Sequence, residues 1–289
     1  MSKKIYNKIE KSFNKYVINQ VNKKFPHYRE HKYSDHYCLI MFKEMLNDVV
    51  KWKSLKKLSA YKGKTEYHYK YLNTVFNKWS KNGIFKDAYM EMLNNEYYKL
   101  KHIKNSKTIK LFVDCSFIYN MYGIDCKATN PEYRKKKCTK ISVIADEQNN
   151  IISMDYDKTH LSAKNKPAFC HDLKLVQENL NNMYIKMQKE KITKLCGDKG
   201  YISKKKFKLN NNKKIKLIAP KRKNQLTPNT KMELKILKKR SSIERSLSFI
   251  KKYNRVVVRK DKKIENYIGF VFLAMLDSFY KKILIDHNL

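Results

Sequence analysis

The segment from Arg240 to Lys251 constrains the fold of this chain most strongly, because it brings charges and an apolar stripe to one side of a helix. Its sequence is Arg240-Ser-Ser-Ile-Glu244-Arg-Ser-Leu-Ser-Phe-Ile-Lys251. At about 100° per residue, Glu244 and Lys251 lie roughly 40° and 20° around the helix from Arg240. The apolar stripe beside them consists of Ile236, Ile243, Leu247 and Ile250. A solvated helix turns its charges away from such a stripe, so this charged face is predicted to border a core.

Two interpretations of the charged face remain open on this segment alone. The first is an ion pair four residues apart on an amphipathic helix, which is common and contributes little energy. The second is a carboxylate at Glu244 that binds a metal ion, with Arg240 and Lys251 beside it to hold phosphate. The segment by itself favours the ion pair, and the rest of the chain changes that balance.

The charge of the whole chain favours a polyanionic partner. The 289 residues include 65 Lys+Arg and 26 Asp+Glu, which gives a formal net charge of +39. Solubility needs far less charge than this, and nucleic acid is the expected partner. Lys, Asn, Ile and Tyr are all frequent, however, and AT-rich coding would explain part of the lysine excess.

The cysteines and the apolar runs bear on the compartment. The six cysteines form no C-x-x-C pair, so they are expected to be free thiols in a reducing compartment rather than zinc ligands. No apolar run approaches a membrane span, and the first residues lack the apolar core of a signal peptide. We therefore expect no membrane association and no secretion. The compartment would be the cytoplasm or nucleoid of a prokaryote, or otherwise a nucleus or viral factory.

Residues 1–106 are predicted to be almost entirely helical. Apolar side chains recur at spacings of three and four through Leu72, Val75, Phe76 and Trp79. The next residues, Lys81-Asn82-Gly83, are a helix stop with the glycine in the left-handed conformation, and a further helix is expected over 86–99. A helix, a short turn and a helix in a basic context fit a helix-turn-helix DNA reader. A plain helical bundle fits equally well.

From residue 107 onward, the pattern predicts alternating strands and helices of the α/β class. One strand is expected to end at Asp114, and a hairpin turn is expected around Asp146. The predicted strands are 109–113, 140–145, 151–156, 191–196 and 214–219. The predicted helices are 171–189, 229–253 and 262–286, with an extended piece at 255–259.

Three acids stand where chemistry would gather in such a fold. Asp114 and Asp198 each follow a predicted strand, and Glu244 lies on the helix described above. Strand ends are where α/β sheets collect functional groups. Closely packed carboxylates need a cation between them to stay ionised. Two Mg²⁺ ions about 3.5–4 Å apart would meet that need and would support an in-line phosphoryl displacement.

Several sequence blocks, in order, carry a family resemblance over roughly residues 65–285. They are Val113-Asp114-Cys-Ser116, His171-Asp172, Asp198-Lys-Gly-Tyr201, Ala219-Pro-Lys-Arg-Lys-Asn224 and Arg240-x3-Glu244-x6-Lys251. In these blocks the chain resembles the DDE transposases of bacterial insertion sequences, nearest the insertion-sequence-five group of the insertion-sequence-four superfamily. Two positions depart from the family pattern. Leu237 stands in place of a signature tyrosine, and Cys115 in place of a small hydroxyl residue.

The resemblance implies an architecture and a site. The implied fold is a ribonuclease-H-like catalytic domain over 107–289, a mixed sheet flanked by helices, preceded by an all-α helix-turn-helix-like domain over 1–106. Asp114, Asp198 and Glu244 would hold two Mg²⁺ or Mn²⁺ ions. Arg240 and Lys251 would position and neutralise phosphate.

The resemblance also implies a reaction and its partners. A DDE transposase hydrolyses a phosphodiester at each transposon end, and the freed 3′-hydroxyl then attacks target DNA. The partners would be double-stranded DNA, as inverted-repeat ends and as target, and further copies of the chain in a homo-oligomer. Two alternatives remain: a domesticated, catalytically silent DNA-binding protein, and a DDE nuclease that cuts without joining.

Other residues have plainer interpretations. Turn chemistry explains Asp146 better than catalysis does, and Asp172 is expected to be a helix N-cap. Phe76 and Trp79 are expected in a core. The basic runs 134–137 and 204–206 fit either solvated surface or phosphate contacts.

Overall fold

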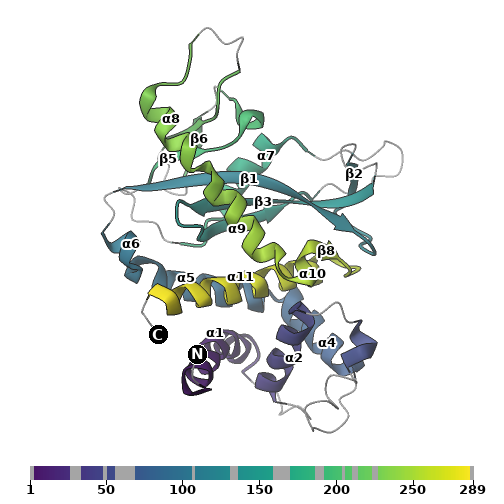
Figure 1. Ribbon diagram of the computed structural model, residues 1–289. Coiled ribbons are helices and arrows are strands. Elements are labelled where there is room, and N and C mark those ends of the chain that lie inside the picture. The colour runs from purple at the N-terminus through teal and green to yellow at the C-terminus, as the bar shows by residue number, and fades with distance from the viewer. Residues whose placement is uncertain are drawn as a thin grey trace. The chain divides into compact units, whose positions relative to one another are not determined.

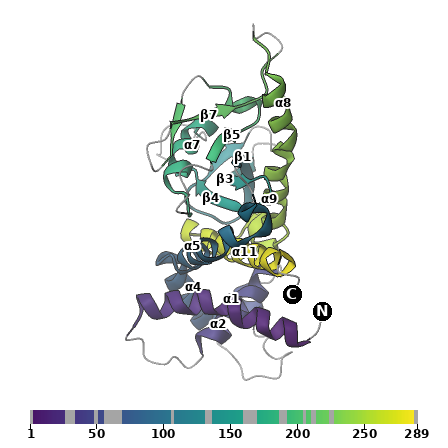
Figure 2. The same cartoon turned by 90° about the vertical axis from the view of Figure 1, so that its left-hand side faces the viewer.

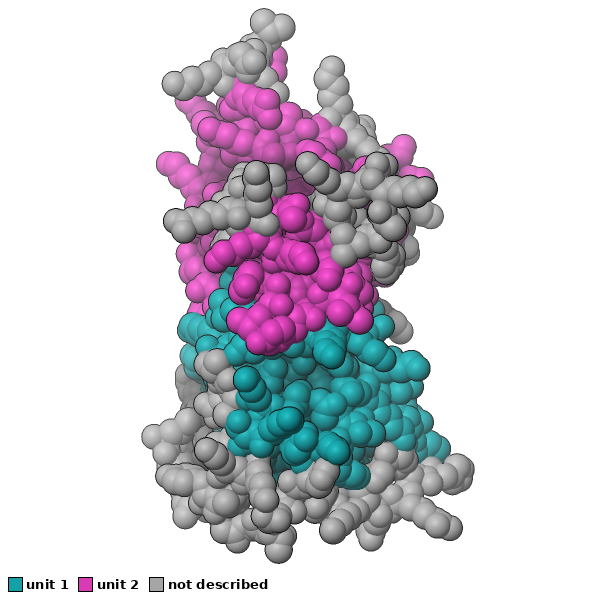
Figure 3. Space-filling model, turned by 90° about the vertical axis from the view of Figure 1, so that its right-hand side faces the viewer, with its two compact units in different colours: residues 1–97, 250–289 teal, residues 98–249 magenta. Residues whose placement is uncertain are grey.

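A computed structural model describes most of the chain. The described residues are 3–26, 34–47, 51–55, 69–105, 108–130, 136–158, 170–185, 192–203, 206–209, 214–222 and 227–286. The chain divides into two compact units, coloured in Figure 3: unit 1 comprises residues 1–97 and 250–289, and unit 2 comprises 98–249. Residues 250–289 were expected in the same domain as the three acids, and they lie in unit 1. The functional division at residue 106 stays a prediction.

Unit 2 is built on a mixed sheet (Figure 1). Its main strands lie in the order β4-β3-β1-β5-β7; β3 pairs antiparallel with β1 and β4, while β5 is parallel to β1 and β7 is parallel to β5. Short strands β2 and β6 pair with β3 and β7. The bounds are β1 Ile109–Asn120, β2 Ala128–Asn130, β3 Lys136–Asp146, β4 Ile151–Tyr156, β5 Ile192–Cys196, β6 Lys206–Lys208 and β7 Lys214–Ile218.

Helices cover both faces of this sheet. Figures 1 and 2 show α7 (Asp172–Asn181) on one face and α8 (Lys231–Leu237) and α9 (Ser241–Lys251) on the other. A short helix, α6 (Lys101–Lys104), precedes β1. A mixed sheet flanked by helices is the ribonuclease-H-like fold that the resemblance implied, and that prediction is confirmed.

Three predicted boundaries in unit 2 differ from the structure. The strand that was expected to end at Asp114 continues to Asn120, because β3 pairs with it from Leu111 to Tyr119. The predicted helix 171–189 ends at Asn181, and residues 182–185 are not helical, while 186–189 lie outside the described residues. The predicted helix 229–253 is divided by a 3-10 turn, η5 (Lys238–Arg240). The turn contains no glycine or proline, and the hydrophobic periodicity continues through it. The sequence pattern therefore did not predict a break in the helix.

The described part of unit 1 consists of helices and turns, with two extended residues at Val258–Arg259. Residues 255–257, expected to be extended, lie in the helical turn α10. Gly83 has φ 67°, the left-handed conformation predicted for the stop between α4 and α5. The helices are α1 Lys3–Lys24, α2 Asp35–Asn47, α4 Tyr69–Lys81, α5 Ile84–Glu96, α10 Asn254–Val257 and α11 Ile264–Asp286, with 3-10 turns at Trp52–Ser54 and Tyr97–Lys99.

An aromatic cluster fills the core of unit 1. The Phe76 ring stacks on Phe270 of α11 with centroids 4.2 Å apart, and Phe42 of α2 contacts both Phe76 and Trp79 edge-on. Phe76 and Trp79 are fully buried, which confirms that both are core residues. The packing also explains why the C-terminal helix lies in unit 1: its apolar residues complete this cluster. Among the described residues, none of the helices has an apolar stretch long enough to cross a membrane.

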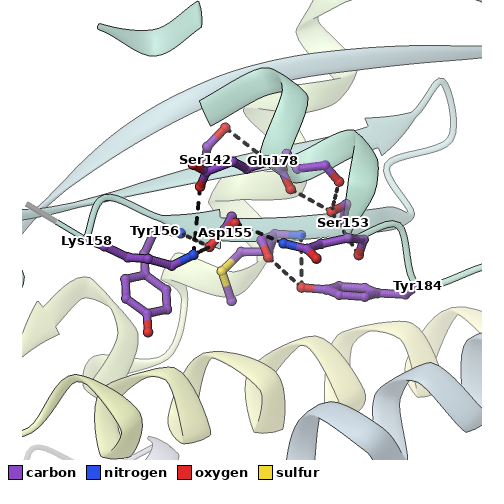
Figure 4. Close-up of polar contacts among 10 residues, drawn as sticks. Ser142, Ser153, Asp155, Tyr156, Lys158, Glu178 and Tyr184 are labelled. Atoms are coloured by element: carbon purple, nitrogen blue, oxygen red, sulfur yellow. Dashed lines mark hydrogen bonds and ion pairs between the residues drawn. The ribbon is translucent and has the colours of Figure 1, made fainter. Parts of the chain in front are cut away.

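In unit 2, a buried polar network attaches α7 to the sheet (Figure 4). The Asn179 amide nitrogen donates to Ser142 Oγ at 2.9 Å, and Ser153 Oγ donates to Asn179 Oδ1 at 2.6 Å. Tyr184 OH donates to the Met154 carbonyl at 2.6 Å. Asn179, Ser142 and Ser153 are fully buried. Each polar group therefore depends on its neighbour, because water cannot replace a lost bond.

Replacing Asn179 with Ala is expected to lower the free energy of unfolding by about 1–3 kcal/mol, because the buried Ser142 hydroxyl loses the amide that donates to it. Ser153 Oγ loses one acceptor and keeps the Asn179 main-chain carbonyl at 2.7 Å. Asn181→Ala, at an exposed position of the same helix, is the matched control. Thermal unfolding of the two variants would test this, and equal midpoints would show that the network contributes little.

Candidate active site

The register between β1 and β5 brings two of the three acids together. In this parallel pair, Phe112 lies opposite Cys196. Asp114 and Asp198 each follow by two residues, and Asp198 keeps extended backbone angles of φ −77° and ψ −172°. Because side chains alternate along extended chain, the Asp114 carboxylate on β1 and the Asp198 carboxylate just beyond β5 are directed to the same side of the sheet.

The pKa of Asp114 reflects its burial and its charged neighbours. Burial raises the pKa of Asp114 to about 6, and repulsion from Asp198 and Asp172 adds to the rise. The Cys115 backbone N–H, 2.9 Å from Asp114 Oδ1, and the Arg240 guanidinium both lower the pKa. A partly buried carboxylate beside a second carboxylate is an environment that a cation would relieve.

Asp198 lies in a tight turn that follows β5. Its Oδ1 accepts the Gly200 N–H at 2.7 Å, which caps the 3-10 turn η4 (Lys199–Tyr201). The Gly197 N–H donates to the Ile218 carbonyl of β7 at 3.0 Å. A Cβ on Gly197 would come within 2.7 Å of the buried Tyr201 ring. Glycine at 197 therefore lets the turn close over the tyrosine and fixes where Asp198 emerges.

Glu244 lies in the first turn of α9 and pairs with Arg240. Glu244 Oε1 is 2.7 Å from Arg240 Nη2, and the glutamate side chain is 53% exposed. Among the described residues, no three His, Cys, Asp or Glu side chains lie close enough together to hold a metal ion. In the structure, Asp114 and Asp198 lie close together with Arg240 nearby. Glu244 instead forms an ion pair with Arg240. Lys251 is the last residue of α9.

The donor atoms present suit a hard divalent cation in part. Mg²⁺ takes one or two protein carboxylates and completes its shell with water and substrate phosphate. Asp114 and Asp198 meet this requirement by residue type and by register. A third ligand from Glu244 would require its side chain to leave Arg240.

Asp172 is not the helix N-cap that the sequence predicted. His171 occupies that position, with Nδ1 accepting the Leu173 N–H at 3.3 Å. Asp172, in the first turn of α7, forms an ion pair with Lys140 of β3, whose side chain is 3% exposed. Lys140 Nζ also donates to the Cys170 carbonyl at 2.6 Å. Sequence reasoning missed Lys140, although a lysine within an apolar strand is a signal for a buried ion pair.

The β3–β4 turn positions the segment that carries Arg240. Asp146 Oδ1 accepts the N–H groups of Gln148 and Asn150, which confirms its role in the turn. Glu147 Oε2 lies 2.9 Å from Lys239 Nζ of η5 and 3.3 Å from Lys110 Nζ of β1. Although burial raises the pKa of Glu147, these two lysines lower it overall. Glu147 thus ties η5 to the sheet, a role that its place in a polar turn did not indicate.

The two basic runs noted in the sequence fall largely outside the described residues. Lys136 and Lys137, at the start of β3, are exposed, while residues 131–135 and 204–205 are not described.

Residues 139–263 match the family model of the transposase DDE domain. The matched stretch contains Asp198, Arg240, Glu244 and Lys251, and it begins after Asp114. This stretch, less than half of the chain, is therefore similar to the transposase DDE domain. A search of curated proteins finds no match to this sequence.

Among solved structures, the piggyBac transposase synaptic complex with hairpin DNA is similar to this chain at a TM-score of 0.49 and 10% identity. The similarity covers 96% of this chain and 74% of that one. A likeness this distant carries no argument about the present site.

Gly197→Ala is expected to lower the free energy of unfolding by about 1–3 kcal/mol, because the new methyl group would overlap the packed Tyr201 ring. Lys199→Ala, at an exposed position of the same turn, serves as control. Thermal unfolding would report the difference. An unfolding midpoint equal to that of the wild type would show that the close approach of the Tyr201 ring to residue 197 does not restrict the turn.

Proposed function

We propose that this chain is a DDE transposase of the bacterial insertion-sequence type, nearest the insertion-sequence-five group. One observation supports it above the others. The β1–β5 register sets Asp114 beside Asp198, and the second of these lies within the stretch that matches the transposase DDE domain. The ordered motifs from Asp114 to Lys251 agree with the same proposal.

The metal ligands in this proposal are Asp114, Asp198 and Glu244. They would hold two Mg²⁺ or Mn²⁺ ions, which supply Lewis-acid stabilisation of the scissile phosphate and a nucleophile at neutral pH. The protein's own contribution is to fix two carboxylates on adjacent strands before substrate arrives. Glu244 would join them by exchanging its contact with Arg240.

Arg240 and Lys251 would act on phosphate. A guanidinium binds phosphate oxygens in a bidentate manner, and an ammonium group neutralises them as a point charge. When a phosphate enters, Arg240 would exchange its bond to Glu244 for bonds to the phosphate. Positive charge near the scissile group would then stabilise the charge that develops there.

The reaction begins with attack of water on the phosphodiester at each transposon end. This step releases a 3′-hydroxyl, which attacks a phosphodiester of the target in the second step. Both substrates are double-stranded DNA, and the net charge of +39 suits that partner. Because two ends must be joined to one target, the acting species would be a homo-oligomer on DNA.

Glu244→Gln is expected to reduce strand cleavage about a hundredfold or more and to leave binding of the end DNA within a few-fold of wild type, since it removes charge from the reaction centre alone. Glu178→Gln, an exposed carboxylate on α7, is the matched control. Cleavage would be followed on a labelled duplex from the DNA that flanks the coding sequence, with Mg²⁺ or Mn²⁺.

The same assay separates the alternatives. Equal loss of binding and cleavage in Glu244→Gln would contradict the metal-ligand role. Specific binding without cleavage by the wild-type protein would indicate a catalytically silent DNA-binding protein. Cleavage at the boundary without any joined product would indicate a nuclease.

A further inference from the structure

We infer that α4, the first helix of the pair around Gly83, is the element of unit 1 that lies in a groove of duplex DNA, and that α5 is not. The inference deepens the proposed function, on which it rests, by naming the surface through which unit 1 meets its DNA partner. In the usual helix-turn-helix arrangement the second helix reads the groove, so the assignment reverses the common expectation.

The two faces of α4 differ sharply. The buried face consists of Leu72, Val75, Phe76 and Trp79, which enter the core of unit 1. The opposite face carries Lys70, Asn73, Thr74, Asn77 and Lys81, at successive spacings of three, one, three and four residues. Lys70, Thr74 and Lys81 are exposed, and the two asparagines are half-buried. These spacings place the polar residues on one side of the helix.

The chemistry of this face suits DNA. The sequence of α4, YKYLNTVFNKWSK, contains three lysines and no acid. Lysines at Lys70 and Lys81 lie near its two ends, where a helix in a groove meets phosphates. Asparagine amides pair bidentately with adenine in the major groove. Asn77 Nδ2 donates to Asn73 Oδ1 at 3.0 Å, and Asn77 Oδ1 is buried. Asn77 therefore orients the Asn73 amide, and Asn73 is the candidate for a base contact.

The polar face of α5 has the opposite charge and is already occupied. Its acids are Asp87, Glu91 and Glu96. Asp87 forms an ion pair with Lys24 of α1. Glu91 accepts from Gln20 and lies 3.4 Å from Lys23 Nζ, and Tyr16 OH donates to Glu96 at 3.2 Å.

These contacts decide between the helices. Because α1 covers the acidic side of α5, a phosphate backbone would have to displace α1 and would then meet three carboxylates. Among the residues that the structure describes, no acid lies on α4, and Lys70 and Lys81 are exposed where they could meet phosphate. Charge complementarity therefore selects α4 as the DNA-facing helix and gives α5 a structural role between α1 and α11.

The test measures DNA binding by variants of the two helices, each in the full-length protein. On α4 the variants are Asn73→Ala and Lys70→Gln. On α5 the matched variants are Asn94→Ala, at an exposed position, and Lys86→Gln. The probes are a fluorescent duplex from the DNA that flanks the coding sequence and a shuffled duplex of the same length. Thermal unfolding of each variant verifies that the fold is kept.

Asn73→Ala is expected to lose roughly tenfold in affinity for the flanking duplex and little for the shuffled one, because a base contact carries sequence information. Lys70→Gln is expected to weaken both duplexes and to reduce the slope of log affinity against log salt by about one, because a phosphate contact releases one counter-ion. The α5 variants are expected to bind both duplexes as wild type does.

Opposite results would overturn the inference. Loss of binding in the α5 variants with none in the α4 variants would return the groove contact to α5 and leave the proposed transposase function intact. An unchanged DNA affinity together with a changed sedimentation mass in the α4 variants would make the α4 face a contact between copies of the chain. A wild-type protein that binds neither duplex would contradict the DNA partner itself, and with it both proposals.

Discussion

The parallel pairing of β1 with β5 is the constraint on which the candidate site depends. Neither strand carries a catalytic group in the paired region, yet the alignment of Phe112 with Cys196 sets Asp114 and Asp198 side by side two residues later. Hydrogen bonds fix the register, and burial of the apolar residues keeps it from slipping, because a shift of one residue would reverse every side chain. The closeness of the two carboxylates is thus a consequence of sheet geometry. Burial raises the pKa of Asp114, and repulsion from Asp198 adds to the rise.

The other half of the site is held by ion pairs rather than by strand pairing. Glu147 joins Lys110 of β1 to Lys239 of η5, and Arg245 Nε donates to Asn149 Oδ1 from α9. These contacts fix the segment that carries Arg240 and Glu244 against the β3–β4 turn. Because each pair is partly exposed, it contributes modest energy alone. Several together hold the start of α9, where the proposed function requires Arg240 and Glu244 to exchange partners when phosphate binds.

Charge is also distributed unevenly between the helices α4 and α5 of unit 1. The acids of α5 are bound to α1, whereas α4 presents lysines and amides with no acid among them. AT-rich coding would explain part of the lysine excess, so the overall charge does not locate a DNA surface. The positions of the few acids indicate better which surface binds DNA. A carboxylate on a phosphate-binding face would repel phosphate and weaken binding, whatever the net charge of the protein.

The sequence by itself determined the mixed α/β class, the limits of β4, the left-handed Gly83, the core positions of Phe76 and Trp79, and the three acids in their order. Each of these follows from local periodicity, turn chemistry or a short motif. The tertiary structure decided the continuation of β1 to Asn120, the 3-10 turn before α9, the Lys140–Asp172 pair, the Glu147 bridge and the place of 250–289 in unit 1. These features depend on partners far away in the chain. The energy of a long strand, a buried ion pair or a docked helix comes from the surface it meets, and local sequence does not specify that surface.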